Sequence, residues 1–288
     1  MKASKLITTL IMAASMAGSG HLLAQNDYAN VNIQTVPVSG NISMLIGAGG
    51  NIGVSAGDDG VLIIDDQFAP LADKIRAAIA ELGSDTPQFL LNTHFHGDHT
   101  GGNADFGMNS IIIAHENVRG RLIAGNSPAS ALPVVTFDDD VTVHFNGEDI
   151  TLIHMPAGHT DTDSVVMFSG SNVIHMGDHF FNGGFPFVDL ANGGTVQGYL
   201  SNLEKALSWI ADDTSIIPGH GPLANKQDLL SFYNVVKNTS TTVRVMKSQM
   251  MSKEEIVAAG LDDEYESWGQ GFINEQRWIE TVFDSYPR

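Results

Sequence analysis

The segment that most constrains this chain is residues 91–103, LNTHFHGDHTGGN. Within six positions it carries four side chains of the types that bind divalent transition metals, namely His94, His96, Asp98 and His99. The apolar residues 89–91 just before it are typical of a short buried strand, and three glycines allow the backbone to turn tightly. Because side chains alternate along a strand, the first two histidines are expected to share one ion, with the other two ligands facing a second ion nearby.

The composition limits both the ligands and the compartment. The chain contains no cysteine, so disulfides and thiolate ligands are excluded and any metal must be held by His, Asp or Glu. Lys2 and Lys5 precede an uncharged, mostly apolar run over residues 6–17, which has the length of a signal-peptide core and is too short to span a bilayer. We therefore expect residues 1–24 to be a signal peptide and residues 25–288 to be a periplasmic or secreted protein without a membrane anchor.

The rest of the chain shows two runs of short strands, each joined to helices. Strands are expected at residues 42–46, 52–55, 61–64, 88–92, 111–114, 141–145, 150–154, 165–168, 173–176 and 215–217. Helices are expected at residues 69–82, 115–122 and 195–210, and again from residue 225 onward. Since no linker separates the two runs, the pattern predicts one domain of two packed sheets flanked by helices.

Three more candidate ligands follow predicted strands, beside glycine or proline. His159 lies in MPAGHTDTDS (residues 155–164), Asp178 follows the strand at 173–176, and His220 lies in PGHG. His115 is better explained as a packing or capping residue at a strand end. His144 and His154 lie within predicted strands rather than in glycine-rich loops, so we do not expect them to bind metal.

In order, the motifs HFHGDH, GHT, GD and PGHG resemble those of the metallo-β-lactamase superfamily over roughly residues 40–225. The resemblance implies a four-layer αβ/βα sandwich with metals at the shared edge of the sheets. It implies that His94, His96 and His159 hold one ion, that Asp98, His99 and His220 hold the other, and that Asp178 bridges both. It also implies that Asp65 braces the metal loop.

The ligand set has a bridging aspartate and no cysteine at the second ion. It therefore resembles the branch of the superfamily that includes glyoxalase II, ribonuclease Z and acyl-homoserine lactonases. The family more often has threonine where this chain has His179, which could reach the substrate but is better explained by packing. Five neutral imidazoles and two carboxylates around two divalent ions leave a positive centre, which lowers the pKa of a bridging water. Asp98 is expected to orient this nucleophile and relay its proton. Two zinc ions are the default cofactor, although iron and manganese also suit these ligand types.

The expected activity is hydrolysis of a small ester, thioester, lactone or amide, β-lactams included. Residues 182–194, with Phe185 and Phe187, are expected to set substrate choice; the two rings either line an apolar groove or pack beneath this loop. The net charge of −19 disfavours nucleic acid as a partner and leaves a small molecule. Two alternatives remain open: a mononuclear iron enzyme that oxidises thiols or persulfides, and a non-catalytic metal-binding accessory protein.

Overall fold

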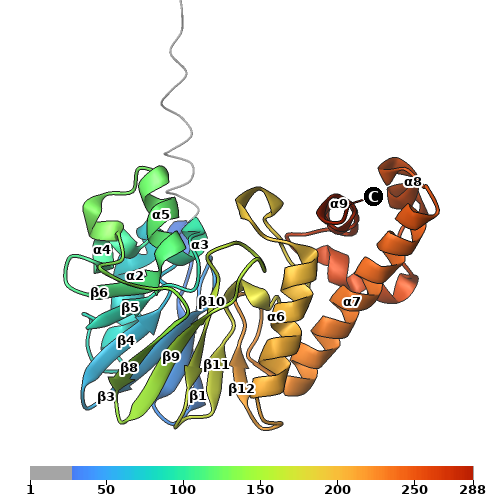
Figure 1. The fold of residues 1–288 in the computed structure, drawn as a ribbon. Coiled ribbons are helices and arrows are strands. Elements are labelled where there is room, and N and C mark those ends of the chain that lie inside the picture. The colour runs from blue at the N-terminus through green and yellow to red at the C-terminus, as the bar shows by residue number, and fades with distance from the viewer. Residues whose placement is uncertain (1–27, 288) are drawn as a thin grey trace, which may run out of the picture.

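A computed structural model describes residues 28–287, so the expected signal peptide lies outside the described residues. Within this part of the chain, two mixed sheets pack face to face (Figure 1). In spatial order, the first sheet contains β1 (Gln34–Ser39), β2 (Ile42–Ile46), β3 (Ile52–Gly57), β4 (Gly60–Ile64), β5 (Phe89–Leu91), β6 (Ile111–His115) and β7 (Val135–Phe137). The second contains β13 (Ala224–Asn225), β12 (Ser215–Ile217), β11 (Val173–His175), β10 (Ser164–Phe168), β9 (Glu148–His154) and β8 (Asp140–Phe145).

Helices cover the outer faces of both sheets. The α-helices of the described residues are α2 (Ala72–Ala80), α3 (Gly97–Thr100), α4 (Asn103–Phe106), α5 (Glu116–Ala124), α6 (Val196–Trp209), α7 (Lys226–Ser248), α8 (Lys253–Ala259) and α9 (Glu275–Ser285). Short 3₁₀ turns include η2 (Ala69–Leu71), η4 (Gly177–His179), η5 (Leu190–Asn192) and η6 (Asp263–Gln270). None of the helices described is both long enough and apolar enough to cross a membrane.

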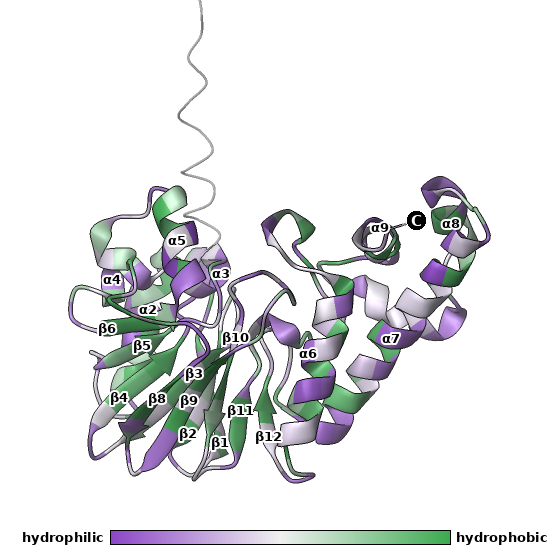
Figure 2. Ribbon diagram, in the orientation of Figure 1, coloured by the Kyte–Doolittle hydropathy of each residue, from purple (hydrophilic) through white to green (hydrophobic). Residues whose placement is uncertain are grey.

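Strand alternation separates the apolar side chains into layers. In β4, Leu62 and Ile64 point between the sheets, whereas Val61 and Ile63 pack against α2 on the outer face. On the second sheet, the outward side chains of β10, β11 and β12 pack against α6, α7 and α9. Apolar residues are accordingly concentrated in the strands and on the inner sides of the helices (Figure 2). The order of layers is helix, sheet, sheet, helix, which confirms the predicted αβ/βα sandwich.

Most predicted elements are present, with shifts at their ends. The predicted hairpin across Asn146 and Gly147 is confirmed, because β8 and β9 pair antiparallel and both turn residues have positive φ, at 51° and 80°. The helix predicted over residues 69–82 begins as the 3₁₀ turn η2, with Pro70 in its first turn, and α2 ends at Ala80. The strands β1, β7 and β13 were not expected; all three lie at sheet edges, where little alternation is required.

The C-terminal helices pack onto the second sheet. Trp278 is fully buried in α9 and donates its indole N–H to Thr239 Oγ1 of α7 at 2.8 Å, while Trp268 is partly buried in the same cluster. Phe185 stacks on Trp278 with ring centroids 5.7 Å apart. The two tryptophans thereby hold the C-terminal helices against the loop of residues 182–194.

Candidate metal centre

All seven predicted ligands lie at one edge of the two sheets, although they come from four separate segments of the chain. His94 and His96 follow β5, while Asp98 and His99 belong to the short helix α3. The other three are on the second sheet's side: His159 in the loop between β9 and β10, Asp178 in η4 after β11, and His220 after β12. Parallel pairing of β4, β5 and β6, and of β11 with β12, brings these strand ends to the same place.

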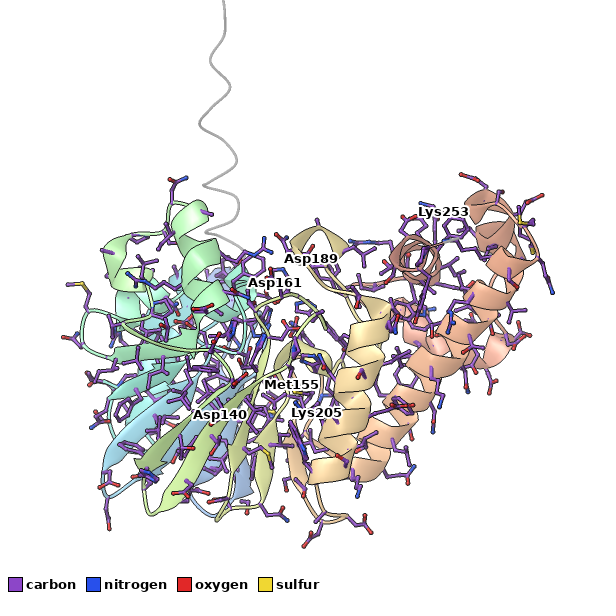
Figure 3. The ribbon with its side chains drawn as sticks, viewed as in Figure 1. Asp140, Met155, Asp161, Asp189, Lys205 and Lys253 are labelled. Carbon is purple, nitrogen blue, oxygen red and sulfur yellow. The ribbon has the colours of Figure 1, made fainter. Side chains whose placement is uncertain are left out.

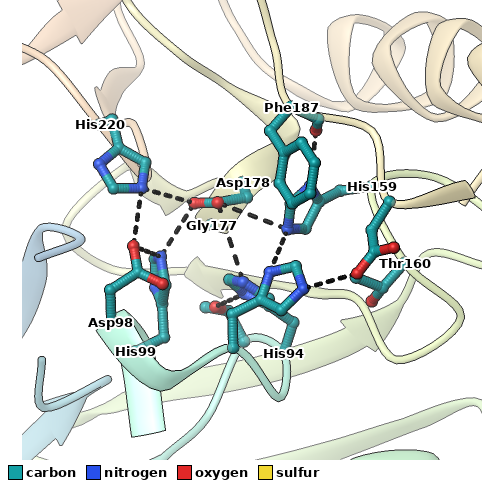
Figure 4. Close-up of polar contacts among 12 residues, drawn as sticks. His94, Asp98, His99, His159, Thr160, Gly177, Asp178, Phe187 and His220 are labelled. Atoms are coloured by element: carbon teal, nitrogen blue, oxygen red, sulfur yellow. Dashed lines mark hydrogen bonds and ion pairs between the residues drawn. The ribbon is translucent and has the colours of Figure 1, made fainter. Parts of the chain in front are cut away.

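The ligand atoms form two groups that share one carboxylate (Figure 4). In one group, Asp178 Oδ2 lies 3.4 Å from His159 Nε2 and 3.8 Å from His94 Nε2. In the other, Asp178 Oδ1 lies 3.0 Å from His99 Nε2 and 3.4 Å from His220 Nε2. His96 completes the first group and Asp98 the second. This grouping coincides with the two sets expected from the sequence, and it directs one oxygen of Asp178 toward each.

Asp65 fixes the orientation of two ligand histidines. Its carboxylate accepts hydrogen bonds from the Thr93 amide at 2.8 Å and from the Thr93 hydroxyl at 2.7 Å. Because that hydroxyl donates to Asp65, it must accept from Nδ1–H of His94, 3.0 Å away. Asp65 Oδ2 also lies 2.8 Å from His99 Nδ1. Both rings therefore donate Nδ1–H toward Asp65 or its partner Thr93 and direct Nε2 into the site, and Asp65 has the bracing position that was expected of it.

The other two histidines of the first group are oriented from the loop of residues 182–194. His159 Nδ1 donates to the carbonyl oxygen of Phe187 at 2.7 Å, which leaves Nε2 without a proton. His96 Nε2 donates a hydrogen bond to Asp189 Oδ2 at 3.0 Å. His96 Nδ1 lies only 2.9 Å from the bare Nε2 of His159. Asp189 lies on the loop above the sheets, near Asp161 (Figure 3).

Bare ring nitrogens that converge in this way fit a cation. Six buried side-chain atoms have no hydrogen-bond partner within residues 28–287, and three of them belong to candidate ligands: His94 Nε2, His99 Nε2 and Asp178 Oδ1. All three face the centre, where leaving them unpaired would be costly unless a metal ion binds them. Burial lowers the pKa of His159 to about 4 and lowers that of His94 well below its usual value, so both rings are neutral, as metal ligands must be. The donor set of imidazoles and carboxylates therefore fits two divalent ions.

In the second group, the carboxylates Asp98 and Asp178 stabilise positive charge on His220. Burial lowers the pKa of His220, but Asp178 and Asp98 outweigh burial and raise it to about 9. Burial also opposes ionisation of Asp178, yet the surrounding imidazoles, His99 first, hold its pKa well below the usual range. Asp98 Oδ2 lies 3.3 Å from His220 Nε2, and its side chain is 29% exposed, compared with 5% for Asp178. Asp98 is thus the carboxylate of the centre most accessible from the surface.

Two glycines allow the backbone to approach the ligands. A Cβ atom on Gly50 would lie 2.0 Å from Cε1 of His99, and one on Gly219 would lie 2.2 Å from Oδ1 of Asp178. Both distances are far inside van der Waals contact, so any side chain at either position would displace a ligand. Gly50 belongs to the turn between β2 and β3, and Gly219 directly precedes His220. Both glycines lie in glycine-rich stretches of the sequence, but the sequence does not show that they contact His99 and Asp178.

The other histidines among residues 28–287 lie outside both groups. His115 caps α5, since its Nδ1 accepts from the Asn117 amide, and its ring stacks on His154 at 3.7 Å. His144 is exposed and pairs with Asp149. His179 is buried, with its Nε2 3.0 Å from Asn202 Nδ2, which places it in the packing around the centre rather than in the pocket. These positions agree with the roles expected for them.

A cavity of about 760 Å³ opens directly onto the centre. Its floor includes His96, Asp98, Asp178 and His220, and five phenylalanines line it, at positions 68, 181, 185, 187 and 272. Phe185 is 2% exposed and packs on Trp278, so most of this ring belongs to the core. Phe187 stacks on His96 with centroids 5.7 Å apart. A larger cavity of about 990 Å³ between α6, α7 and the C-terminal end is lined by none of the candidate ligands.

Comparison with known proteins settles the family. The family model described as the metallo-beta-lactamase superfamily matches residues 46–220, more than half of the chain. This chain belongs to the metallo-beta-lactamase superfamily. The matched region contains all seven candidate ligands and ends at His220. Two solved structures have the same fold. The DIM-1 metallo-beta-lactamase has a TM-score of 0.61 and 17% sequence identity, and the match covers 73% of this chain and 99% of that one. The metallo-beta-lactamase of Pontibacter korlensis has a TM-score of 0.60 and 16% sequence identity, and the match covers 72% of this chain and 100% of that one.

The matches to curated relatives cover a smaller share of this chain than the matches to the solved structures do. A hydroxyacylglutathione hydrolase of Polaromonas sp. strain JS666 is 31% identical over 139 residues, which cover 47% of this chain and 49% of the relative. The probable metallo-hydrolase YqgX of Bacillus subtilis is 28% identical over 192 residues, covering 60% of this chain and 90% of the relative. The chain spans about half the length of the hydroxyacylglutathione hydrolases it matches.

Proposed function

We propose that this chain is a metal-dependent hydrolase with two divalent ions, zinc by default, that cleaves a small ester, thioester, lactone or amide. The observation that carries the proposal is the shared carboxylate of Asp178, which directs one oxygen toward each of two ligand groups. The printed names of two relatives, a hydroxyacylglutathione hydrolase and a probable metallo-hydrolase, give further support. The structural neighbours make β-lactams reasonable members of the test panel.

When bound, two such ions supply Lewis acidity and lower the pKa of water. The side chains of this protein supply orientation and proton transfer. Asp98 is the carboxylate most accessible from the cavity, and we assign to it the orientation of the attacking water and the acceptance of its proton. Asp65 and Asp189 hold the ligand imidazoles in one tautomer, so that ring nitrogens need not reorient during the reaction.

We further propose that the protein is exported, with residues 1–24 removed and residues 25–288 forming the mature chain. This part of the proposal rests on the charged start and apolar run of the sequence. Loss of Lys2 and Lys5 would make the mature protein still more acidic, which favours a small-molecule substrate over nucleic acid. The mass of the protein recovered from a periplasmic fraction tests it. A full-length chain confined to the cytoplasm would contradict export.

Metal analysis by plasma mass spectrometry, together with a hydrolysis panel, tests the catalytic proposal. We expect about two zinc ions per chain and turnover of at least one ester, thioester, lactone or β-lactam. His94→Ala should lose metal and activity, whereas His144→Ala, at a histidine with an 80% exposed side chain, should keep both. A single iron with thiol or persulfide oxidation would overturn the hydrolase proposal. Two metal ions without any turnover would favour an accessory binding role instead.

A further inference from the structure

Resting on the proposed hydrolase function, we propose that the substrate carries an uncharged, apolar acyl group and that Phe272 is a specificity-determining residue for it. Phe272 lies between η6 and α9, more than fifty residues beyond His220, where the family match ends. It nevertheless lines the same cavity as the candidate ligands. The C-terminal segment thus contributes one wall of a site whose chemistry is supplied by the preceding sheets.

Each ligand group has a phenylalanine ring lying flat against one of its imidazoles. Phe187 stacks on His96 at 5.7 Å with 30° between the planes, and Phe181 stacks on His220 at 5.1 Å with 13°. Phe272 meets the Phe187 ring edge-on at 6.1 Å and 87°. A carbonyl group placed between the two ligand groups therefore has aromatic surface on both sides of it. Its acyl substituent would extend along these rings toward Phe272.

Phe272 is 73% exposed even though its neighbours hold it in place. The next residue, Ile273, is buried, and the Arg277 guanidinium lies over the Phe272 ring at 5.0 Å from its centroid. The adjoining segment is tied to the substrate loop, because the Phe185 amide donates to the Trp268 carbonyl oxygen at 3.0 Å. A large apolar side chain held at the mouth of a cavity, with most of its surface in water, is suited to cover a bound apolar group.

The charges around the cavity argue against an anionic acyl group. None of the residues that line it is lysine or arginine, and apart from the ligand histidines His96 and His220 its ionisable side chains are the carboxylates Asp98 and Asp178 of the candidate centre. Arg277 lies against the Phe272 ring and is not among the lining residues. A carboxylate on the acyl group would find no lysine or arginine in the cavity, and neither would the carboxylates of a hydroxyacylglutathione, which lie on its glutathione leaving group. The cavity therefore favours an ester, thioester or lactone with an aliphatic or aromatic tail.

Kinetics of the zinc-loaded protein with acetyl, butyryl and octanoyl p-nitrophenyl esters and a hydroxyacylglutathione test this inference. We expect kcat/KM to rise about tenfold from the acetyl to the octanoyl ester and to be lowest for the glutathione thioester. Phe272→Ala should lower the octanoyl to acetyl ratio about tenfold, mainly through KM, and Phe272→Leu should restore part of it. Met250→Ala, at a 79% exposed methionine that lines only the distant cavity, is the matched control and should leave the ratio unchanged.

Calorimetric binding of octanamide to the same zinc-loaded proteins provides a readout that does not need turnover. We expect Phe272→Ala to weaken binding about tenfold while Met250→Ala does not. Binding with this dependence but without hydrolysis of any substrate would keep the inference and overturn the proposed hydrolase function. Hydrolysis without dependence on acyl length, or a preference for the glutathione thioester, would overturn the inference and keep the hydrolase.

Discussion

The close approach of Gly50 to His99 makes a sharp prediction for Gly50→Ala. The new Cβ would lie 2.0 Å from His99 Cε1, so the ring must retreat by about 1.5 Å to reach ordinary contact. The backbone cannot easily move instead, because the Gly50 amide donates to the Asp98 carbonyl oxygen at 3.0 Å and its own carbonyl oxygen accepts from Gln67 Nε2 at 2.7 Å. The imidazole is therefore the part that shifts.

Two costs follow from that shift. Forcing one extra methyl group into a packed site costs about 1–3 kcal/mol. Breaking the hydrogen bond between His99 Nδ1 and the Asp65 carboxylate costs about 1.5–3 kcal/mol more. Metal–ligand distances tolerate only about 0.2 Å of error, so the ion held by His99 should be lost while the other remains. We expect about 2.5–6 kcal/mol of lost stability and one zinc per chain instead of two.

Urea unfolding and plasma mass spectrometry measure these two effects. Gly97→Ala is the matched control, since it lies in the same metal loop and its Cβ would meet nothing within 4 Å. That variant should keep two zinc ions and near-native stability. If Gly50→Ala also retained both ions and unfolded within about 1 kcal/mol of the native protein, the placement of His99 as a rigid ligand would be refuted.

Three further perturbations separate the roles of the surrounding side chains. Asp98→Asn should keep the fold and most of the metal but lose most turnover, as measured by kcat against metal content; unchanged activity would contradict its assigned role. Asp189→Ala removes the acceptor for His96 Nε2 and should weaken metal affinity about 10–100-fold in a chelator competition, with partial recovery in Asp189→Asn. Removing the metal with a chelator should lower the thermal midpoint, because converging bare nitrogens and carboxylates lose their common partner; an unchanged midpoint would argue against metal at this site.

The sequence could predict which side chains come together as candidate ligands because their pattern is local. His94 to His99 follow a strand whose alternation fixes their direction, and the other three each follow an apolar run beside glycine or proline. The assignment of Asp178 as a bridge came from the resemblance rather than from periodicity. The structure adds a geometric reason for that assignment, because the two carboxylate oxygens of Asp178 face different ligand groups.

Contacts between distant segments could not be predicted in the same way. Gly50 meets His99 and Gly219 meets Asp178 across gaps of about forty residues or more, and neither glycine differs in its local sequence from an ordinary turn. Nothing near Phe272 indicates that it lines the same cavity as His96. The open question about Phe185 and Phe187 is answered by tertiary packing, which buries the first against Trp278 and leaves the second against a ligand imidazole.

The division of the chain has a consequence for substrate choice. The seven candidate ligands all lie within residues 46–220, where the family match is found, and their bracing partners Asp65 and Asp189 lie there as well. The wall formed by Phe272 comes from residues beyond that match, held in place through Trp268 and Trp278. Changes in the C-terminal segment can therefore alter the acyl pocket without moving a ligand atom. Relatives that share the ligand set but differ in this segment need not share a substrate, which is why the acyl series, rather than the metal content, is the measurement that identifies the substrate class of this protein.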